Sequence, residues 1–435
     1  MRIDPIKTHI EMDRTSDPGL ESWIEVEEGS DFPIQNLPFG IFRRPGMQAG
    51  ACTRIGNMVI SLHELATHSY LKETGIDPRF FNKSNLNDLF ALGRHSLQKI
   101  RSRLSDIFNI DNPLLRDNLK VAREILFPIS EVEILMPVKV GDFTDFYSSE
   151  SHARNLGTIF RGAENALNQN WKYLPVGYHG RASSIMVSGT SIHRPKGQMI
   201  SPVLKSPVFG PTKQLDFELE LAFITGKPSV LGEPITTEHA EDHIVGFVLM
   251  NDLSARDIQH WEYSPLGPFL GKNFGSVISP WVITLDALEP FRVRGREQEP
   301  AVLQYLTFKG DHHFDIALEV YYKVNGGKEV RITKTNYKNI YWNIVQQLAH
   351  QTVNGCNINP GDIYSSGAIS GLGKDSFGSM IELTWGGTKS LLVAPGEERE
   401  FIKDYDTIIL RGYAERNGLR IGFGEAVVKI LPANE

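Results

Sequence analysis

The sequence predicts a mainly β protein with some α-helix, built from a small N-terminal unit and a larger C-terminal domain. From about residue 137 almost to the C-terminus, Gly and Pro punctuate short runs of Val, Ile, Phe and Tyr. This pattern is typical of curved sheets or a barrel-like roll with a few inserted helices. The chain has 435 residues, of which 41% are hydrophobic and 10% aromatic, so it is long enough for two or three globular domains. We therefore expect one domain at residues 1–137 and another at residues 138–435.

The N-terminal unit begins with strands and continues with helices. Short alternating segments at residues 40–42 and 57–62 are broken by Pro and Gly, which favours a small β-rich unit. Apolar residues recur at helical spacing in residues 94–108 and again in residues 113–126, so each range predicts a helix. Residues 133–137 follow as a connecting strand.

Helical patterns are few in the C-terminal domain. They occur at about residues 149–160, 255–263 and 339–351. The rest of this domain is predicted to be strands joined by Gly- and Pro-containing turns.

The charge of the chain limits its partners. A formal net charge of −7 and an isoelectric point near 6.0 provide no basic stripe that could displace counterions from phosphates, so no nucleic-acid partner is expected. The short basic piece at residues 101–103 is flanked by acidic residues. We interpret it as a solvated helix face.

The cysteine count and the apolar runs bear on location. Cys52 and Cys356 are the two cysteines of the chain, and so few cysteines in a protein of this size favour a reducing compartment. Residues 1–5 lack the apolar run of a signal peptide. No stretch has the length of uncharged apolar sequence that a membrane span needs. We expect a cytoplasmic protein with no membrane partner.

The strongest local signal for chemistry is the alternating run at residues 215–221. It predicts a strand with its leucines and phenylalanine on one face and Asp216, Glu218 and Glu220 on the other. Neighbouring carboxylates on such a face lie about 6.5–7 Å apart. Two interpretations stay open: a solvated sheet face, or a site for a hard cation that prefers carboxylate oxygens.

A second acidic residue stands at the end of an apolar strand. Residues 246–252 run into Asp252, and Ser254 with Asp257 then has the form of an N-cap pair that opens a helix. On that helix one side carries residues spaced by four, three and four positions. They are Asp252, Arg256, Gln259 and Tyr263. Solvation and oxygen-ligand binding are both consistent with this polar stripe.

A third acidic source precedes another predicted helix. Ser148 or Ser149 can cap a helix that carries His152, with Asp145 and Tyr147 just upstream. A histidine on an apolar helix face is often a core residue. Here, however, an acid, a phenol and an imidazole meet at one helix N-terminus, where anionic ligands are also favoured.

Residues 379–385 alternate again, and we predict a strand with Glu382 on the face opposite Ile381, Leu383 and Trp385. Such a glutamate usually faces solvent. Its functional alternative is to orient an imidazole supplied from elsewhere in the chain.

These segments together resemble the fumarylacetoacetase family. The matching motifs are residues 142–147 with His152, then 174–184, 216–220, 250–257, 267–272, 353–356 and 376–383. The resemblance implies a small SH3-like N-terminal β-barrel, a larger C-terminal β domain and a homodimer. It also implies metal-dependent hydrolysis of a carbon–carbon bond in the β-diketo acid 4-fumarylacetoacetate, the last step of tyrosine breakdown, giving fumarate and acetoacetate.

The resemblance also implies roles for individual residues. Asp145, Glu218, Glu220 and Asp252 would hold Ca²⁺, and a nearby Mg²⁺ would involve Asp252, Lys272 and Ser276. His152 would be the general base and Glu382 its orienting partner. The donors to the developing oxyanion would be Arg256, Gln259 and Lys272. The substrate would be positioned by Tyr147, Arg161, Tyr178, Gln259, Tyr263 and residue 368.

The sequence departs from the family pattern at two positions. Ala368 stands where a substrate-contacting threonine is expected, which removes a side-chain hydroxyl. Ser276 stands where another threonine is expected and keeps the hydroxyl. The first departure affects substrate affinity or fine specificity, and neither changes the reaction class.

Two other functions compete with this interpretation. Relatives in the wider superfamily act on acylpyruvates or other 2-oxo acids with a similar acidic metal site, but they usually lack the long N-terminal domain. The other alternative is a catalytically silent metal-binding scaffold. A scaffold needs neither His152 nor Glu382, so their presence argues against it.

Overall fold

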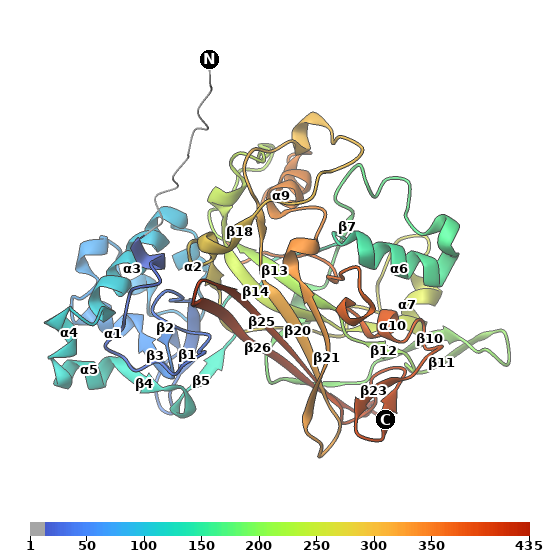
Figure 1. The fold of residues 1–435 in the computed structure, drawn as a ribbon, viewed down its shortest axis with the longest axis horizontal. Coiled ribbons are helices and arrows are strands. Elements are labelled where there is room, and N and C mark those ends of the chain that lie inside the picture. The colour runs from blue at the N-terminus through green and yellow to red at the C-terminus, as the bar shows by residue number, and fades with distance from the viewer. Residues whose placement is uncertain (1–13) are drawn as a thin grey trace.

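The computed structural model describes residues 14–435, so residues 1–5, considered above for a signal peptide, lie outside the described part. Figure 1 shows an N-terminal part in which helices surround short strands, beside a larger C-terminal part with long strands. The predicted mainly β fold with some α-helix is confirmed. Among residues 14–435, no helix is both long enough and apolar enough to cross a membrane.

The N-terminal part is a five-stranded antiparallel sheet with order β4-β3-β2-β1-β5 and a set of helices around it. Its strands are β1 Gly40–Arg43, β2 Gly50–Ile55, β3 Met58–Ser61, β4 Leu126–Pro128 and β5 Glu133–Leu135. Its helices are α1 Leu62–Thr67, α2 Asn87–Phe90, α3 Arg94–Phe108, α4 Pro113–Arg116 and α5 Leu119–Ile125. The strands predicted at 40–42, 57–62 and 133–137 and the helix at 94–108 are confirmed.

Two expectations for the N-terminal part are wrong. The single helix predicted at 113–126 is two helices, because the Asn118 side chain accepts the backbone N–H of Val121 and starts α5 anew. Arg101 is not on a solvated face. It is buried, and its guanidinium donates to the Thr15 hydroxyl at 2.8 Å and to the Asn36 carbonyl at 2.6 Å.

The C-terminal part contains two large sheets. The first has the path β7-β6-β22-β13-β14-β16-β8, with β17 also paired to β14, and the second has the order β21-β20-β25-β26-β9. The strands of the first sheet are β6 Phe143–Phe146, β7 Gly177–His179, β8 Ile185–Val187, β13 Leu219–Thr225, β14 Ile244–Asp252, β16 Ser276–Ile278, β17 Ile283–Thr284 and β22 Ile363–Ser365. Those of the second are β9 Ser191–His193, β20 Ala317–Lys323, β21 Glu329–Asn336, β25 Thr407–Arg416 and β26 Leu419–Leu431.

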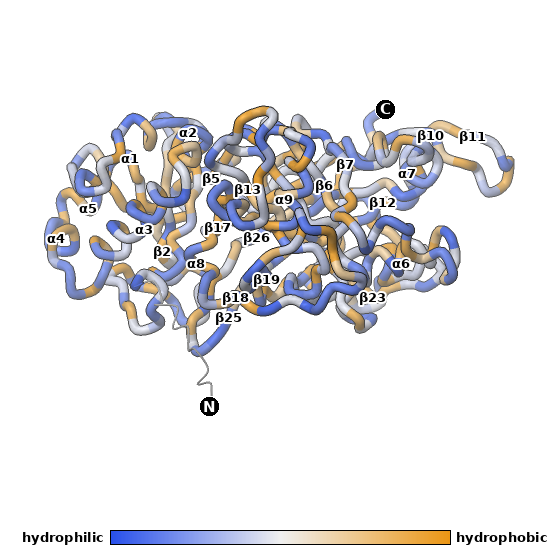
Figure 2. The backbone as a smooth tube through the Cα atoms, turned by 90° about the horizontal axis from the view of Figure 1, so that it is seen from above, coloured by the Kyte–Doolittle hydropathy of each residue, from blue (hydrophilic) through white to orange (hydrophobic). Residues whose placement is uncertain are grey.

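Four short two-stranded pairs complete the strands. They are β10 Lys196–Ile200 with β11 Pro207–Pro211, β12 Leu215–Asp216 with β15 Ser254–Ala255, β18 Arg292–Val293 with β19 His313–Phe314, and β23 Leu391–Ala394 with β24 Glu397–Arg399. The hairpin β10–β11 projects from the body of the protein in both views (Figures 1 and 2).

The helices of the C-terminal part are α6 Glu150–Arg161, α7 Arg256–Glu262, α8 Leu285–Leu288, α9 Ile344–Thr352 and α10 Met380–Leu383. The helices predicted at 149–160 and 255–263 are confirmed. The helix predicted at 339–351 begins later, at Ile344, because Asn343 and Gln346 form a reciprocal capping box there.

The first sheet is covered on both faces. On β13, Leu221 and Phe223 belong to the core beneath the second sheet, whereas Ala222 and Ile224 belong to a core shared with the N-terminal part. All nine residues of β14 are buried. Polar side chains at the ends of these strands are therefore removed from bulk water, which makes their charges costly unless they are compensated.

An ion network joins the two parts of the chain. Arg94, at the start of α3, contacts Asp286 of α8 at 2.8 Å and Glu241 at 3.5 Å. Glu241 also accepts from Arg292 at 2.8 Å and from His312 Nδ1 at 2.6 Å. Burial opposes ionisation of Glu241, but the hydrogen bonds from His312 and Arg292 outweigh it and lower its pKa to about 2.

This shift predicts an acid-sensitive contribution to stability. The pKa of Glu241 is lowered from 4.5 to about 2 in the folded protein. The ionised carboxylate therefore stabilises the fold fully above about pH 4.5, and this stabilisation is lost as the pH falls toward 2. Glu241→Gln should lower the free energy of unfolding by about 3 kcal/mol at pH 7 and by less than half of that at pH 3.

Urea unfolding at the two pH values measures this difference, and Glu164→Gln, at an exposed position, is the control that should change neither value. An equal loss at pH 7 and pH 3 would contradict the assignment.

Candidate active site and metal centre

Four buried carboxylates converge at one end of the first sheet. Asp145 lies on β6, Glu218 precedes β13, Glu220 lies on β13 and Asp252 ends β14. One oxygen of each lies within 4.8 Å of one oxygen of every other member. In residues 14–435, no other group of three or more His, Cys, Asp or Glu side chains meets this geometric condition for holding a metal ion.

Strand order and register bring these residues together. Asp145 is paired with Ser365 of β22, which separates β6 from β13, and the Ser365 hydroxyl donates to Glu220. The backbone N–H of Asp252 donates to the carbonyl of Glu218 at 3.2 Å. Three strands, β6, β13 and β14, thus supply a carboxylate cluster that no single segment could form, and β22 lies between the first two.

The alternation predicted for residues 215–221 is present, but its acidic side chains do not form a solvated sheet face. The chain leaves the ladder between β12 and β13, and none of its acidic side chains faces solvent, because further layers cover them. Glu218 and Glu220 enter the cluster. Asp216 does not: it accepts from Arg256 Nε at 2.8 Å and from the backbone N–H of Met380 at 2.7 Å.

The cluster fits a divalent cation. Asp145 Oδ1 and Glu220 Oε1 are buried without a hydrogen-bond partner. Burial, reinforced by the Asp252 charge, raises the pKa of Asp145 well above its usual range, and burial with the Asp145 charge does the same for Glu220. An oxygen-rich set of this kind, with unsatisfied acceptors and excess negative charge, is what Ca²⁺ or Mg²⁺ prefers.

Two buried cations offset part of the negative charge. Lys272 Nζ donates to Asp252 at 2.6 Å and also to Glu218, and Arg256 Nη2 donates to Glu218 at 2.7 Å. Burial opposes ionisation of Glu218, but the charges of Lys272 and Arg256 outweigh it and lower its pKa. Ser276 donates to the other oxygen of Asp252 at 2.6 Å.

A histidine and a glutamate form a pair beside the cluster. His152, in the first turn of α6, lies with Nδ1 2.7 Å from Glu382 Oε2 and with Nε2 3.8 Å from Glu218 Oε1. Burial opposes ionisation of Glu382, but the interaction with His152 and the hydrogen bonds from Ser379 and Asn155 outweigh it and lower its pKa. An ionised Glu382 can only accept, so in the neutral imidazole Nδ1 carries the proton and Nε2 carries the free lone pair.

The strand predicted at 379–385 is wrong. Residues 380–383 form the short helix α10, whose first N–H groups are accepted by the Asp216 carboxylate at 2.7 and 3.1 Å. Glu382 nevertheless contacts His152, and its role in orienting that ring remains a prediction.

A cavity of about 380 Å³ opens over these groups. His152, Glu218 and Asp145 form part of its floor, and α6 and α7 flank it. Of the other residues predicted to act on substrate, the cavity lining includes Tyr147, Arg161, Tyr178, Arg256, Gln259, Tyr263, Lys272 and Ala368. Glu382 contacts His152 but is not part of the cavity lining. The lining also does not include Glu220, Asp252 or Ser276.

The polar stripe predicted on the helix after β14 exists, with a different start. Ser254 and Asp257 do not cap α7; Ser254 lies in β15, and Asp257 accepts from the backbone N–H of Lys213 at 2.8 Å. Arg256 Nη1 donates to Gln259 Oε1 at 3.1 Å. Because that oxygen is occupied, the Gln259 amide nitrogen is the group free to donate into the cavity.

Tyr178 separates the main cavity from a smaller one of about 150 Å³. Its hydroxyl donates to Asp252 at 3.3 Å. Asp252, Lys272 and Ser276, the residues implied for a second cation, all line the smaller cavity. Ala368 lies in the main cavity, where it is 1% exposed.

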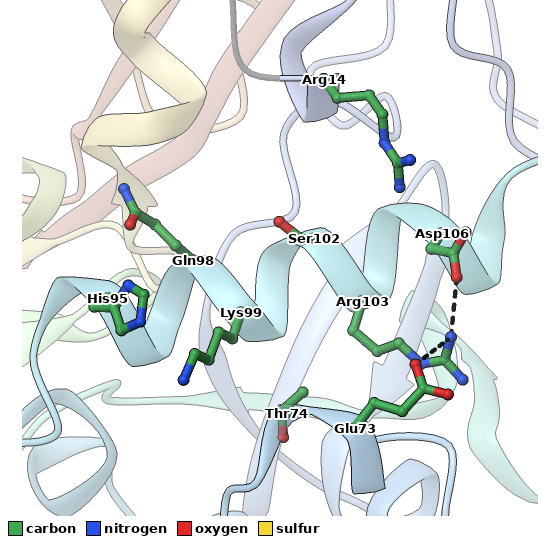
Figure 3. A pocket seen from close by; sticks show the side chains of 9 residues that line it. All are labelled: Arg14, Glu73, Thr74, His95, Gln98, Lys99, Ser102, Arg103 and Asp106. Carbon is green, nitrogen blue, oxygen red and sulfur yellow. Dashed lines mark hydrogen bonds and ion pairs between the residues drawn. The ribbon is translucent and has the colours of Figure 1, made fainter.

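A further groove of about 440 Å³ lies on the N-terminal part, along α3 (Figure 3). Its two acidic residues, Glu73 and Asp106, both contact Arg103, at 3.3 and 2.9 Å. They are therefore engaged with a cation of the chain itself, and the groove lacks the converging carboxylates of the main cavity.

No motif in the sequence indicated that three further residues contact Glu382. Asn155, Ser370 and Ser379 all donate to its carboxylate. Asn155 follows His152 by three positions on the predicted helix, so its face was foreseeable even though its partner was not.

Comparison with known proteins identifies the family. The profile described as "Fumarylacetoacetase N-terminal" matches residues 35–137, and the one described as "Fumarylacetoacetate (FAA) hydrolase C-terminal" matches residues 142–429. The chain belongs to the fumarylacetoacetase family. The resemblance carried by the sequence motifs is therefore confirmed.

Relatives match over nearly their whole length. The fumarylacetoacetase of Dictyostelium discoideum is 49% identical over 96% of this chain and 99% of its own. That of Rattus norvegicus is 46% identical over 95% of this chain and 99% of its own. Among solved structures, the fold is shared with a protein of Mycobacterium smegmatis described as a putative HpcE protein, at a TM-score of 0.50 and 17% identity, covering 91% of this chain and 99% of that one.

The cluster predicts a measurable loss of cation binding on removal of one charge. Glu220→Gln removes a carboxylate whose Oε1 lacks any other partner, so the affinity for a divalent cation should fall at least about tenfold. Calorimetric titration of the metal-free protein with Ca²⁺ measures it. Asp257→Asn is the control, because that side chain binds Thr212 and the Lys213 N–H instead of the cluster. Equal affinities in wild type and Glu220→Gln would remove Glu220 from the site.

Proposed function

We propose that this chain hydrolyses 4-fumarylacetoacetate to fumarate and acetoacetate, the last step of tyrosine degradation. The observation that carries the proposal is the buried His152–Glu382 pair, which opens onto the same cavity as Asp145 and Glu218 of the carboxylate cluster. Relatives that are 46–49% identical over 95–96% of the chain are named fumarylacetoacetases, which supports this substrate. The chain is thus a hydrolase acting on a carbon–carbon bond.

We propose Ca²⁺ as the resident ion, held by Asp145, Glu218, Glu220 and Asp252. The unpartnered oxygens of Asp145 and Glu220 support this assignment. A second ion, Mg²⁺, would involve Asp252, Lys272 and Ser276, which line one small cavity; the Lys272 ammonium donates to Asp252 and has no lone pair, so only the backbone carbonyl of that residue could be a ligand. A bound divalent cation supplies Lewis-acid polarisation of the two ketone oxygens of the substrate and a template for its orientation.

Proton transfer falls to His152. Its Nε2 takes a proton from a water molecule in the cavity, and the resulting hydroxide attacks the fumaryl carbonyl carbon. Glu382, held ionised by its donors, stabilises the imidazolium that forms. When the carbon–carbon bond breaks, its electron pair leaves with the acetoacetate carbon, and the imidazolium returns its proton there. One water is consumed and the histidine is neutral again.

The negative oxygen formed on attack needs donors. Gln259 offers its amide nitrogen, because Arg256 occupies its oxygen, and Lys272 lines the cavity with one of its three N–H groups uncommitted. Arg256 has N–H groups left after its bonds to Asp216, Glu218 and Gln259. One such preorganised donor is typically worth about 3–4 kcal/mol of transition-state stabilisation.

The remaining lining residues would position the substrate. Tyr147 packs edge-to-face on His152, with ring centroids 5.5 Å apart. Arg161 uses Nε and Nη2 to hold the carbonyls of Asn165 and Ala166, both at 3.1 Å, which fixes its guanidinium at the cavity. Tyr178 and Tyr263 also line the cavity, and Tyr263 is 41% exposed. Residue 368 contributes only backbone and a methyl group.

The acylpyruvate-type alternative is not favoured. The chain matches its relatives over 99% of their length, N-terminal domain included, and they carry the fumarylacetoacetase name. A silent scaffold would have no use for a buried His–Glu pair at the floor of a cavity.

We also propose a cytoplasmic homodimer. Neither cysteine of the chain is in a disulfide, which fits a reducing compartment. Exposed apolar side chains gather on the projecting hairpin β10–β11 and its tip, where Val203, Leu204 and Phe209 are 85%, 68% and 74% exposed. Apolar side chains exposed together in this way are characteristic of an interface.

Replacement of the proposed base, His152, should strongly slow turnover. His152→Ala should lower kcat for fumarylacetoacetate by about 10²- to 10⁴-fold, the usual contribution of a positioned general base, with Ca²⁺ binding unchanged. Loss of the ultraviolet absorbance of the substrate measures it, with metal-stripped and Ca²⁺-restored wild type alongside. Wild-type activity in the variant would refute the role of His152; inactive but folded, Ca²⁺-loaded wild type would refute the substrate.

The exposed apolar side chains of the β10–β11 hairpin predict that the protein is a dimer. Wild type should sediment with about twice the 48.8 kDa chain mass, and the double variant Leu204→Glu, Phe209→Glu as a monomer. Leu303→Glu, at an exposed apolar side chain elsewhere, should leave the dimer intact. A monomeric wild type at micromolar concentration would refute the dimer, and a dimeric double variant would refute this surface.

A further inference from the structure

Glu382 has more hydrogen-bond donors than an orienting partner of one histidine requires. Its Oε2 accepts from His152 at 2.7 Å and from Ser379 at 2.6 Å, and its Oε1 accepts from Asn155 Nδ2 at 2.8 Å. The Ser370 hydroxyl lies 2.9 Å from both oxygens. These donors come from α6, from the loop after β22 and from the start of α10.

We propose that Asn155 is a positioning residue for the reaction, which fixes the plane of the Glu382 carboxylate and so the direction of the His152 ring. This inference rests on the proposed function of the His152–Glu382 pair and adds a residue to it.

The helix geometry supports the assignment. Asn155 follows His152 by three positions on α6, so both side chains lie on the same face of the helix. They therefore reach one carboxylate from one rigid element, His152 at Oε2 and Asn155 at Oε1. Two donors on a single helix set the rotation of the carboxylate with respect to that helix.

The hydroxyl groups cannot replace this contact fully. Ser370 has one hydroxyl proton, which it can give to one of its two neighbouring oxygens at a time. Its oxygen is also used, because it accepts the backbone N–H of Gly378 at 2.9 Å. Ser379 reaches Oε2 only. Asn155 is thus the donor committed to Oε1.

Other contacts show that the surrounding segments are held without Asn155. The Ser149 hydroxyl, at the N-cap of α6, donates to the carbonyl of Ser370 at 3.2 Å and accepts its backbone N–H at 3.1 Å. This pair of bonds ties α6 to the loop independently. Loss of the Asn155 amide should therefore change the carboxylate and leave the helix in place.

The test replaces Asn155 and follows two independent properties. Asn155→Leu keeps the size of the side chain and removes the donor. Its kcat should fall about ten- to a hundredfold, as for loss of one hydrogen bond to a charged group, with KM and Ca²⁺ content unchanged. The second property is the downfield proton resonance of His152 Nδ1–H in histidine-labelled resting enzyme, which should shift upfield or broaden. Arg154→Ala, on the same helix but exposed, should change neither.

A kcat within twofold of wild type, or an unchanged Nδ1–H resonance, would overturn the proposal. If Asn155→Leu does not fold, Asn155→Ala serves in its place, because it removes the N–H donor and adds neither charge nor bulk; a wild-type kcat or resonance in that variant would equally overturn the proposal. The resonance needs no substrate, so a failure of the proposed reaction would appear as an inactive wild type with the Asn155 effect on the resonance still present.

Discussion

The structure depends on an electrostatic constraint: four carboxylates are buried together at the end of a sheet that is covered on both faces. Like charges in a water-poor setting repel strongly, and each raises the pKa of its neighbours. The high pKa values of Asp145 and Glu220 express this conflict. A bound metal ion would offset this negative charge, so the fold around the cluster and its capacity to hold an ion are two aspects of one arrangement.

The surrounding charges follow from the same constraint. Lys272 and Arg256 are themselves buried, and their positive charges lower the pKa of Glu218. Arg256 also contacts Asp216, which in turn accepts the first N–H groups of α10. The helix that carries Glu382 is thus anchored through Arg256, which also contacts the carboxylate cluster, so the His152–Glu382 pair and the cluster are linked by one set of contacts.

Much of this site could be predicted from the sequence, because its members lie in motifs with local signals. Ser149 and the helical spacing after it gave α6 and the position of His152. The run at residues 379–385 predicted a strand, which is wrong, and an orienting role for Glu382, which remains a prediction. Such a short alternating run fits a strand as well as a helical turn. The carboxylate that accepts the first N–H group of the helix belongs to Asp216, which lies 164 positions from Met380 in the chain.

Other features had no local signal at all. Glu218 and Glu220 are shielded from solvent because segments far away in the sequence cover this face of the sheet. An alternating pattern shows which residues share a face, but it does not show what packs against that face. Arg101 has the sequence context of a solvated basic residue, yet it is buried and donates to the carbonyls of Gln35 and Asn36, in the segment before β1. Ser370 and Ser379 are ordinary residue types whose importance follows only from their distance to Glu382.

In the proposed reaction the nucleophile is a water molecule activated at His152 Nε2, although several buried carboxylates lie nearby. A single turnover of fumarylacetoacetate in H₂¹⁸O, with enzyme in excess, tests this directly by mass spectrometry of the products. We expect one ¹⁸O atom in the new carboxylate of fumarate from the first turnover. First-turnover fumarate that carries only ¹⁶O would show that a carboxylate of the protein attacks first, and would contradict the account.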